Sequence, residues 1–354
     1  MNLATSLGAP QAERPLYRWR ALPPRATFRR LSATRAPPPP RARAHPVSEP
    51  RVTVAICTWN RSALLRPTLE EMTRLEVPPG LAWELLVVNN NCTDDTDRVI
   101  ADFETRLPVR RLFEPVPGLS NARNCAVVAA RGRWIVWTDD DVLVDPSWLA
   151  AYARAFDRWP EAAIFGGPIS PWFPAPPPDW LTASWPRIAN AYACIDYGAE
   201  AFELTERRVP FGANIAFRTD RLRAMPFDPE RGVKPGSRMG GEETGVVRAL
   251  LAAGDTGWWV SDARVRHFIP EERQTLDYVR EWFDAYGEYL GRYGTEPPAA
   301  MIFGKPRWLV RQAIVTSVRG WWRRRLRPAP EWMDDFIAAH TARGALRGWS
   351  RRTK

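Results

Sequence analysis

The stretch that decides the fold is Trp134-Ile135-Val136-Trp137-Thr138-Asp139-Asp140-Asp141, an apolar segment that ends on three consecutive carboxylates. Side chains alternate along an extended chain, so we expect Asp139 and Asp141 to point the same way and Asp140 to point the opposite way. Two carboxylates that converge at the carboxyl end of a strand can hold a hard divalent cation, which balances the charge of a bound diphosphate. A competing interpretation is that the acidic residues favour the start of a helix near 145–147.

Strands and helices alternate outward from this stretch. Buried apolar runs predict strands at 52–57, 84–88, 109–113, 134–138 and 162–167. Helices are predicted at 62–74, 93–103, 121–130 and 246–253. This order predicts an α/β fold of the Rossmann-like kind, with a mostly parallel central sheet flanked by helices.

Polar clusters follow three of these strands. They are Thr58-Trp59-Asn60-Arg61, Asn89-Asn90-Asn91 and the three aspartates. Ligands of open parallel sheets bind at the carboxyl ends of the strands, where all three clusters lie. The sequence therefore predicts a ligand site at this edge of the sheet.

The second half of the chain is less regular and richer in Trp, Pro and Gly. Residues 172–185 predict a proline-rich aromatic loop, which beside a site is typical of a binding or lid element, and residues 211–217 predict a short extended segment. Gly240-Gly241-Glu242-Glu243-Thr244 places two carboxylates at the start of a helix. There they either face a ligand or only cap the helix.

The composition is that of a soluble globular protein with a substantial core. Of the 354 residues, 45% are hydrophobic and 25% are charged. No run approaches the roughly 18 to 20 apolar residues of a membrane-spanning helix, and the N-terminus lacks the apolar core of a signal peptide, so we expect a cytoplasmic location. The four cysteines have no metal-type spacing and are expected to be reduced and packed as small apolar residues.

The net charge of +10 is concentrated at the two ends of the chain. Residues 1–50 carry nine Arg and two Glu and predict a disordered tail rich in Pro and Arg. Residues 305–327 carry eight Lys or Arg and no acid, interleaved with tryptophans. This composition predicts an amphipathic helix that lies on the anionic inner face of a membrane or docks on the body by its aromatic side. The body itself is mildly acidic, which argues against nucleic acid as a partner.

The motifs, in this order, resemble the family-two glycosyltransferases, inverting enzymes with the A-type nucleotide-sugar transferase fold, in their non-processive branch. The resemblance runs over about 51–294. Residues 58–61 resemble the opening nucleotide-binding turn, and residues 86–91 match the segment whose aspartate usually reads uracil, with Asn89 in its place. An amide can accept a hydrogen bond from a base and can also donate one. The resemblance implies that the nucleotide is contacted by Thr58, Asn60, Arg61, Asn89 and Asn91.

Further matches imply a diphosphate and metal site. Gly118-Leu119-Ser120-Asn121-Ala122-Arg123-Asn124 resembles the helix start that supplies an arginine near the nucleotide, here Arg123. Asp139 and Asp141 are the expected outer pair of the metal motif, and Asp139 and Asp140 are also expected at the nucleotide. His267 matches a histidine that completes the metal site in many relatives. Such a donor set suits Mn²⁺ or Mg²⁺.

The resemblance also implies the catalytic base and the acceptor side. Glu242 and Glu243 fall where the family has an acidic pair whose second member is the base, so we expect Glu243 to act, with Glu242 as the alternative. Such a base accepts the proton of an acceptor hydroxyl. Indole rings stack on the apolar faces of sugars. The residues expected to contact the acceptor are Trp172, Trp180, Trp185 and Asn214.

These interpretations predict a metal-dependent inverting glycosyltransferase. It is expected to move one sugar from a nucleotide-diphosphate sugar, of the UDP type, to a carbohydrate or lipid-linked acceptor in surface polysaccharide or glycoconjugate synthesis. We expect a catalytic domain at 51–294, with a nucleotide-binding half at 51–145 and an acceptor half at 146–294. A basic helical extension follows at 295–354.

Two alternatives belong to other classes of protein. A nucleotidyltransferase on a similar sheet would be expected to carry a glycine-rich phosphate loop near the first strand, but residues 58–66 contain no glycine. A non-enzymatic basic adaptor would bind nucleic acid or anionic membrane through the two basic ends. The mildly acidic body and the matched order of motifs argue against this adaptor.

Overall fold

The computed structural model describes residues 49–233, 240–294 and 300–351. Most of the tail predicted at 1–50 therefore lies outside the described residues. So does part of the predicted extension.

A seven-stranded sheet forms the centre of the described chain, in the spatial order β3-β2-β1-β4-β8-β6-β9. Its strands are β1 Val52–Thr58, β2 Trp83–Asn89, β3 Val109–Phe113, β4 Trp134–Asp139, β6 Ile164–Gly166, β8 Ile215–Arg218 and β9 Gly257–Trp259. The first four are mutually parallel, β8 runs antiparallel to both β4 and β6, and β9 is parallel to β6. The predicted α/β fold with a mostly parallel sheet is confirmed.

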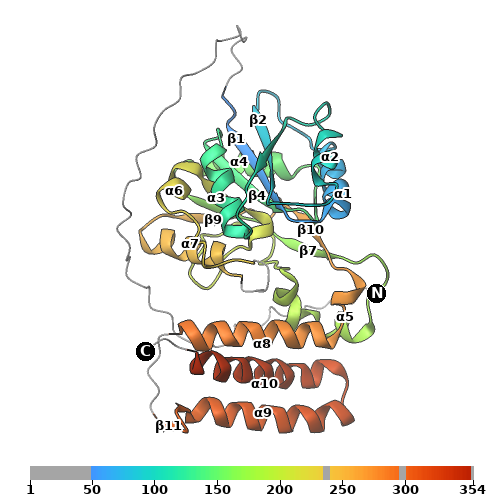
Figure 1. The fold of residues 1–354 in the computed structure, drawn as a ribbon, viewed down its shortest axis with the longest axis vertical. Helices are drawn as coiled ribbons and strands as arrows, with labels where there is room; N and C mark the ends of the chain where they lie inside the picture. The colour runs from blue at the N-terminus through green and yellow to red at the C-terminus, as the bar shows by residue number, and fades with distance from the viewer. Residues whose placement is uncertain (1–48, 234–239, 295–299, 352–354) are drawn as a thin grey trace, which may run out of the picture.

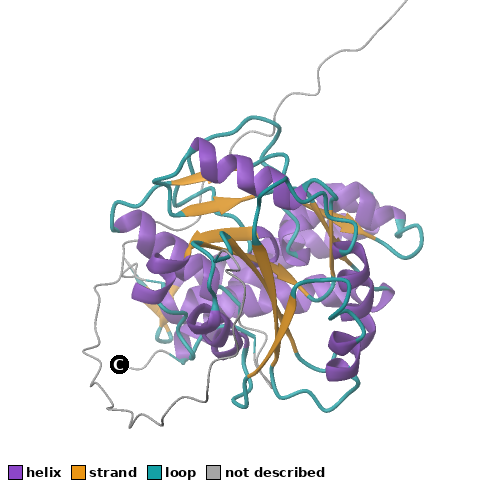
Figure 2. Ribbon diagram, turned by 90° about the horizontal axis from the view of Figure 1, so that it is seen from above, coloured by secondary structure: helices purple, strands orange, loops and turns teal. Residues whose placement is uncertain are grey.

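Helices cover both faces of this sheet (Figure 2). Those of the α/β body are α1 Ser62–Met72, α2 Thr96–Ala101, α3 Leu119–Ala129, α4 Trp148–Arg158, α5 Asp179–Ile188, α6 Thr219–Ala224 and α7 Glu242–Ala252. Along β1, Val54 and Ile56 belong to one buried cluster with residues of α1 and α4, whereas Ala55 belongs to another with residues of α3 and α7. Burial on both faces explains why β1 is a continuous apolar run.

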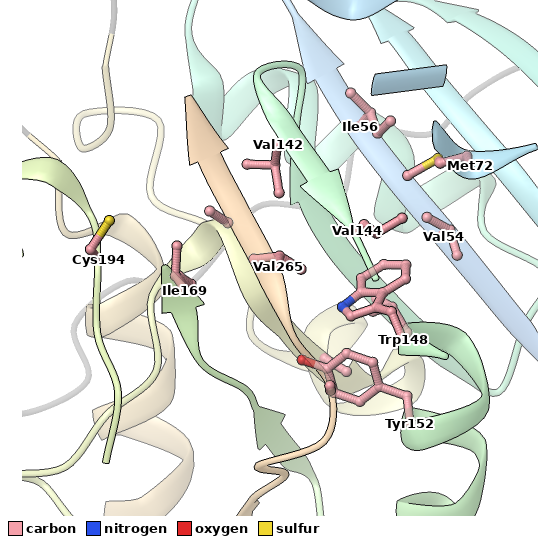
Figure 3. Close-up of a cluster of buried hydrophobic side chains, with 14 of the residues drawn as sticks. Val54, Ile56, Met72, Val142, Val144, Trp148, Tyr152, Ile169, Cys194 and Val265 are labelled. Atoms are coloured by element: carbon pink, nitrogen blue, oxygen red, sulfur yellow. The ribbon is translucent and has the colours of Figure 1, made fainter. Parts of the chain in front are cut away.

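A small second sheet determines the geometry of the site. It consists of β5 Val142–Val144, β10 Val265–Phe268 and β7 Ile169–Trp172, in that order. Val142, Val144 and Val265 pack toward Val54 of β1 and toward Trp148 at the start of α4 (Figure 3). In register, His267 lies opposite Val142, the residue that follows the three aspartates.

The proline-rich segment differs from the predicted loop, because Asp179–Ile188 forms helix α5. Pro178 occupies the position before the first helical residue, where its fixed φ is compatible with a helix start. Pro186 lies inside the helix, in its second half. The segment predicted as extended at 211–217 begins as a 3₁₀ turn, Gly212–Asn214, and continues into β8. The density of prolines concealed the helix at the sequence level.

Three long helices form a layer below the α/β body (Figure 1). They are α8 Leu276–Tyr293, α9 Arg307–Leu326 and α10 Ala329–Ser350, and α10 lies between the other two. Short elements complete the chain: β11 Met301–Ile302, β12 Lys305–Pro306, and the 3₁₀ turns Ala189–Tyr192 and Glu271–Arg273. Within the described ranges, no helix combines the length and the apolar character needed to cross a bilayer.

Glycines bring α8 and α10 together closely. A Cβ atom built on Gly287 or Gly291 of α8 would lie 2.8 Å from the carbonyl carbon of Thr341 or Ala345 of α10, and closer still to its oxygen. Gly344 and Gly348 of α10 meet the backbone of α8 in the same way. Backbone therefore packs against backbone along this pair, and only glycine fits at the contacts.

Candidate active site

An arginine clamp closes over the carboxyl ends of β1 and β4. Arg61, the residue before α1, places Nη1 2.6 Å from Oδ1 of Asp140, and its Nη2 pairs with Oδ2 of Asp141. Thr58, the last residue of β1, donates its hydroxyl to Oδ2 of Asp140 at 2.7 Å. Burial raises the pKa of Asp140 to about 7 despite the nearby charge of Arg61. Arg61 keeps a third of its side chain exposed, so it borders open solvent.

The three aspartates do not alternate as predicted. The chain turns directly after Asp139, so Asp140 and Asp141 both reach Arg61. Asp139 remains partly exposed and lies nearer the positive charge of Arg123. Burial raises the pKa of Asp139, and Arg123 opposes that rise. Because of this turn, Asp139 and Asp141 are not neighbours on one face of a strand, and the three carboxylates point in different directions than predicted.

His267 completes a pair with Asp141. Its Nδ1 lies 2.7 Å from the carbonyl oxygen of Tyr192, which fixes Nδ1 as the protonated nitrogen. Its Nε2 then points at Oδ2 of Asp141, 3.4 Å away. Although burial disfavours the charged imidazole, Asp141 raises the pKa of His267 to about 10. Burial likewise opposes ionisation of Asp141, but His267 and Arg61 hold the pKa of this carboxyl well below its usual range.

The Asp141–His267 pair fits a divalent cation in part. A histidine that donates Nδ1–H to a backbone carbonyl has the arrangement found in metal sites, and a cation at Nε2 would have to displace the proton that the raised pKa keeps there. Among the described residues, however, no three His, Cys, Asp or Glu side chains form a complete ligand group. A cation held by Asp141 and His267 would need its other ligands from a bound diphosphate and water, as Mg²⁺ commonly has.

A second buried ion pair lies at the start of α7. Nη1 of Arg123 is 2.7 Å from Oε1 of Glu242 and 3.8 Å from Oε2 of Glu243. Burial raises the pKa of Glu242 to about 8, and the charge of Glu243 adds to that rise. Gly241, with φ of 94°, makes the tight turn before the helix. Both glutamates therefore occupy the first turn of α7, as predicted.

The asparagines of the predicted nucleotide turn bind other parts of the protein. Asn60 accepts a hydrogen bond from the backbone of Thr93 at 2.6 Å. Asn89 accepts from the backbone N–H of Cys92 and donates to Asp97, 2.6 Å away. Asn91 is exposed and adopts a left-handed conformation, with φ of 59°. These bonds fasten the loops after β1 and β2 to each other.

The residues predicted to contact an acceptor are separated by the structure. Trp172 ends β7, one strand from His267, and its ring lies against Phe268. Trp185 packs on Tyr192, and Trp180 is also partly buried against the core. Trp172 therefore lies one strand from His267, with its ring on the neighbouring residue Phe268.

Asn214 is fully buried, and its side chain makes four hydrogen bonds inside the fold. Its amide donates to the carbonyls of Pro168 and Ala263, and its oxygen accepts from Trp148 and Tyr152. No hydrogen-bonding capacity remains for a sugar. The predicted contact of Asn214 with an acceptor therefore has no support, because the residue joins β8 to α4 and to the segment before β10.

Two contributors to the site were missed at the sequence level. Tyr192 orients His267 through its backbone carbonyl, which leaves no signature in the identity of the side chain. Gly212 makes room for Arg123, since a Cβ atom there would lie 3.2 Å from Cζ of that arginine. A glycine at the start of the 211–217 segment was the visible signal, but its partner lies in α3.

Comparison with known proteins shows which proteins this chain resembles. Glycosyl transferase family 2 matches residues 53–195. The succinoglycan biosynthesis protein ExoM of Rhizobium meliloti (strain 1021) is 23% identical over 245 residues, which cover 68% of this chain and 74% of that protein. The validoxylamine A glucosyltransferase of Streptomyces hygroscopicus subsp. limoneus is 31% identical over 139 residues, covering 39% of this chain and 30% of that protein. The chain is thus similar to glycosyl transferase family 2 over residues 53–195.

The fold also has a solved counterpart. The mannosyltransferase PcManGT from Pyrobaculum calidifontis, in complex with GDP-Man and Mn²⁺, superposes with a TM-score of 0.55 at 20% identity and covers 87% of this chain and 89% of that one. The predicted A-type glycosyltransferase fold is confirmed. The family match ends at 195, so Glu242, Glu243 and His267 lie beyond it, and their relation to the matched part is seen in the contacts Arg123–Glu242 and Asp141–His267.

Proposed function

We propose that this glycosyltransferase moves one sugar from a nucleotide-diphosphate sugar to an acceptor hydroxyl, in a single displacement that inverts the anomeric carbon. The main support is the meeting of Arg61, Asp141 and His267 at the carboxyl ends of parallel strands. A cation-binding pair and an arginine fork are the groups that a diphosphate needs. Nucleotides bind at this edge of open α/β sheets.

The donor diphosphate would lie beside Arg61, because this arginine borders solvent while Arg123 is buried. Its guanidinium can exchange Asp140 and Asp141 for phosphate oxygens. A divalent cation, when held by Asp141 and His267, supplies positive charge for the leaving diphosphate. Uridine remains the expected base of the donor.

Glu243 would accept the proton of the acceptor hydroxyl. The new bond joins the acceptor oxygen to the anomeric carbon, the bond from that carbon to the diphosphate oxygen breaks, and the proton moves to the Glu243 carboxylate. Glu243 suits this role because it keeps 14% of its side chain exposed, whereas Glu242 is almost fully buried. No covalent intermediate is needed.

The acceptor is proposed to be a carbohydrate or a lipid-linked saccharide of a surface polysaccharide or glycoconjugate. ExoM is named for succinoglycan biosynthesis, which is polysaccharide synthesis. Trp172, at the end of β7, offers a partly exposed indole beside the site. An indole face of this kind suits a sugar ring of the acceptor.

We also propose that α9 binds an anionic membrane surface. Its packing on α10 uses the small or aliphatic residues Leu309, Ala313 and Thr316, so its aromatic side does not dock on the body. Trp321 and Trp322 are 52% and 58% exposed. Arg325 lies over the ring of Trp321, and seven arginines between 307 and 327 make the helix strongly basic, which suits the interface of an anionic bilayer.

The donor site can be tested by thermal-shift measurements with UDP, GDP and their sugars, with and without Mn²⁺. Binding to the folded state raises the melting temperature without any need for an acceptor. We expect a Mn²⁺-dependent shift with one nucleotide, and its loss in Asp141→Asn. Asp157→Asn, which alters a surface carboxylate paired with Arg51, serves as the control and keeps the shift. A folded protein that responds to no nucleotide would contradict the proposal.

Membrane binding can be tested by sedimentation with phosphatidylglycerol vesicles. Trp321→Ser with Trp322→Ser should release the full chain from the vesicles, because the exposed rings supply the apolar contact. Phe113→Ser removes a similarly exposed ring on β3 and should leave binding intact. Equal binding by all three proteins would overturn the assignment of α9.

A further inference from the structure

Arg123 lies where no substrate can reach its guanidinium. Its side chain projects from α3 and is only 4% exposed. The guanidinium carbon lies 5.6 Å from the ring centre of Trp137 and 5.4 Å from that of Phe227. The backbone of Gly212 closes a third side. An arginine enclosed in this way is fixed in place before any ligand arrives.

The two glutamates that contact Arg123 differ in their surroundings. Oε1 of Glu242 takes the short bond to Arg123, and a Cβ atom on Gly232 would lie 3.4 Å from its Oε2. Within the described part of the chain, that Oε2 has no hydrogen-bond partner. Glu243 lies farther from Arg123 and reaches solvent. One carboxylate is therefore buried against Arg123, and its neighbour in sequence keeps part of its side chain in contact with solvent.

We propose that Arg123 is a positioning residue, which binds Glu242 and thereby directs Glu243 toward the acceptor. This inference rests on the proposed transfer reaction and deepens it. The role differs from the nucleotide contact predicted for Arg123 from the sequence. It also assigns the two glutamates different tasks, since Glu242 anchors the first turn of α7 and Glu243 takes the proton.

The charged groups near Glu242 and Glu243 are consistent with separate roles for the two glutamates. Among the described residues, Arg123 of α3 contacts both glutamates, and Nη1 of Arg231 would lie 3.0 Å from a Cβ atom on Gly245, further along the first turns of α7. The negative charge of Asp139 also acts on Arg123. An opposite charge within about 4 to 6 Å favours the ionised form of a carboxyl group. Removing Arg123 would leave Glu243 beside another buried acid with less positive charge nearby.

The test is the pH dependence of nucleoside diphosphate release, with water as the acceptor and Mn²⁺ present. UDP-glucose, UDP-N-acetylglucosamine and GDP-mannose are supplied in turn. For Arg123→Met we expect kcat to fall at least tenfold, with KM for the donor within about threefold. The acid limb of the kcat profile should move up by roughly one pH unit or more, because Glu243 loses its counter-charge. Glu242→Gln removes the neighbouring acid and should move that limb down or leave it in place.

Two further variants separate positioning from folding. Arg123→Lys keeps the charge without the planar fork, so its acid limb should stay closer to that of the wild type than the limb of Arg123→Met. Arg110→Met breaks the pair between Arg110 and Glu84, 2.9 Å apart and away from the site. It should lower the melting temperature and leave the pH profile in place.

Each contrary outcome has a distinct meaning. A raised KM for the donor with an unmoved acid limb in Arg123→Met would show that Arg123 contacts the diphosphate. A lowered melting temperature with kcat and its pH profile unchanged would show a structural role alone. Either result overturns the positioning role while the transfer reaction stands. If the folded wild-type protein binds no nucleotide and releases no diphosphate from any donor, the reaction itself fails and the positioning role fails with it.

Discussion

The contact between α8 and α10 gives a stability prediction that can be worked from distances. A Cβ atom at Gly291 would lie 2.8 Å from the carbonyl carbon of Ala345, whereas carbon atoms pack at about 3.5 to 4.0 Å. The two backbones must therefore separate by roughly 0.7 Å or more in Gly291→Ala. Overpacking costs about 1 to 3 kcal/mol, and a contact with rigid backbone belongs at the upper end. Alanine favours the helix over glycine by about 1 kcal/mol, so the net loss is about 2 kcal/mol.

The assay is thermal unfolding followed by circular dichroism. A loss of that size corresponds to a fall in melting temperature of about 4 to 8 °C for a domain of 150 to 250 residues. Gly320→Ala on α9 is the matched control, since its Cβ atom would lie 3.3 Å from Cβ of Asp335 and no closer than 3.7 Å to the backbone of α10. It should leave the melting temperature unchanged or raise it slightly. If Gly291→Ala is as stable as Gly320→Ala, the backbone contact between α8 and α10 is not as close as described.

Three further predictions concern the site. Glu243→Gln should bind nucleotide with wild-type affinity and lose about 10²- to 10⁴-fold in kcat, measured by diphosphate release, and weaker nucleotide binding would contradict the role of a base. Burial raises the pKa of Glu242 to about 8, so this group stabilises the fold below its ordinary pKa and loses that contribution as the pH rises toward 8. Between pH 5 and pH 8, the melting temperature of Glu242→Gln should therefore rise relative to that of the wild type. If the difference between the two melting temperatures does not change with pH, the pKa of Glu242 is not raised. Asn214→Ala leaves four buried groups without their hydrogen-bond partner. It should lower the free energy of unfolding, measured by urea titration, by about 3 kcal/mol or more. A loss below about 1 kcal/mol would show that the fold does not depend on this network.

The sequence predicted the strands and helices of the first half because burial and periodicity coincide there. Val52–Thr58 and Val109–Phe113 are apolar or half-buried runs between turns, and their bounds differ from the prediction by one residue at most. Helix α5 was missed because four prolines precede it and Pro186 lies within it. Local composition there favours a loop, and packing of Leu181 and Ile188 against the core overrides it.

The sequence indicated candidate residues for the site, but it did not indicate which of them contact one another. Arg61 and His267 were expected beside the aspartates, but their shared partner Asp141 follows from the register of β10 on β5, which no local pattern encodes. The burial of Arg123 depends on Trp137, on a partner more than one hundred residues away in α7 and on a glycine. Pairings of this kind are set by tertiary contacts, so sequence motifs indicate which residues gather and leave open which of them touch substrate.

The ion pairs of Arg61 with Asp140 and Asp141 should affect the binding of Mn²⁺ alone and the binding of a nucleotide with Mn²⁺ in opposite directions. Without a ligand, Arg61 neutralises Asp140 and Asp141, so a cation that binds alone must displace the guanidinium from Asp141. When a diphosphate binds with the cation, the guanidinium gains a new anionic partner and the displacement costs less. Arg61→Met should therefore bind Mn²⁺ alone more tightly than the wild type and bind UDP or GDP with Mn²⁺ more weakly. Calorimetric titration measures both affinities, with Arg66→Met, which breaks only the surface pair with Asp102, as the control. If both affinities change in the same direction, Arg61 does not alternate between the carboxylates and the diphosphate.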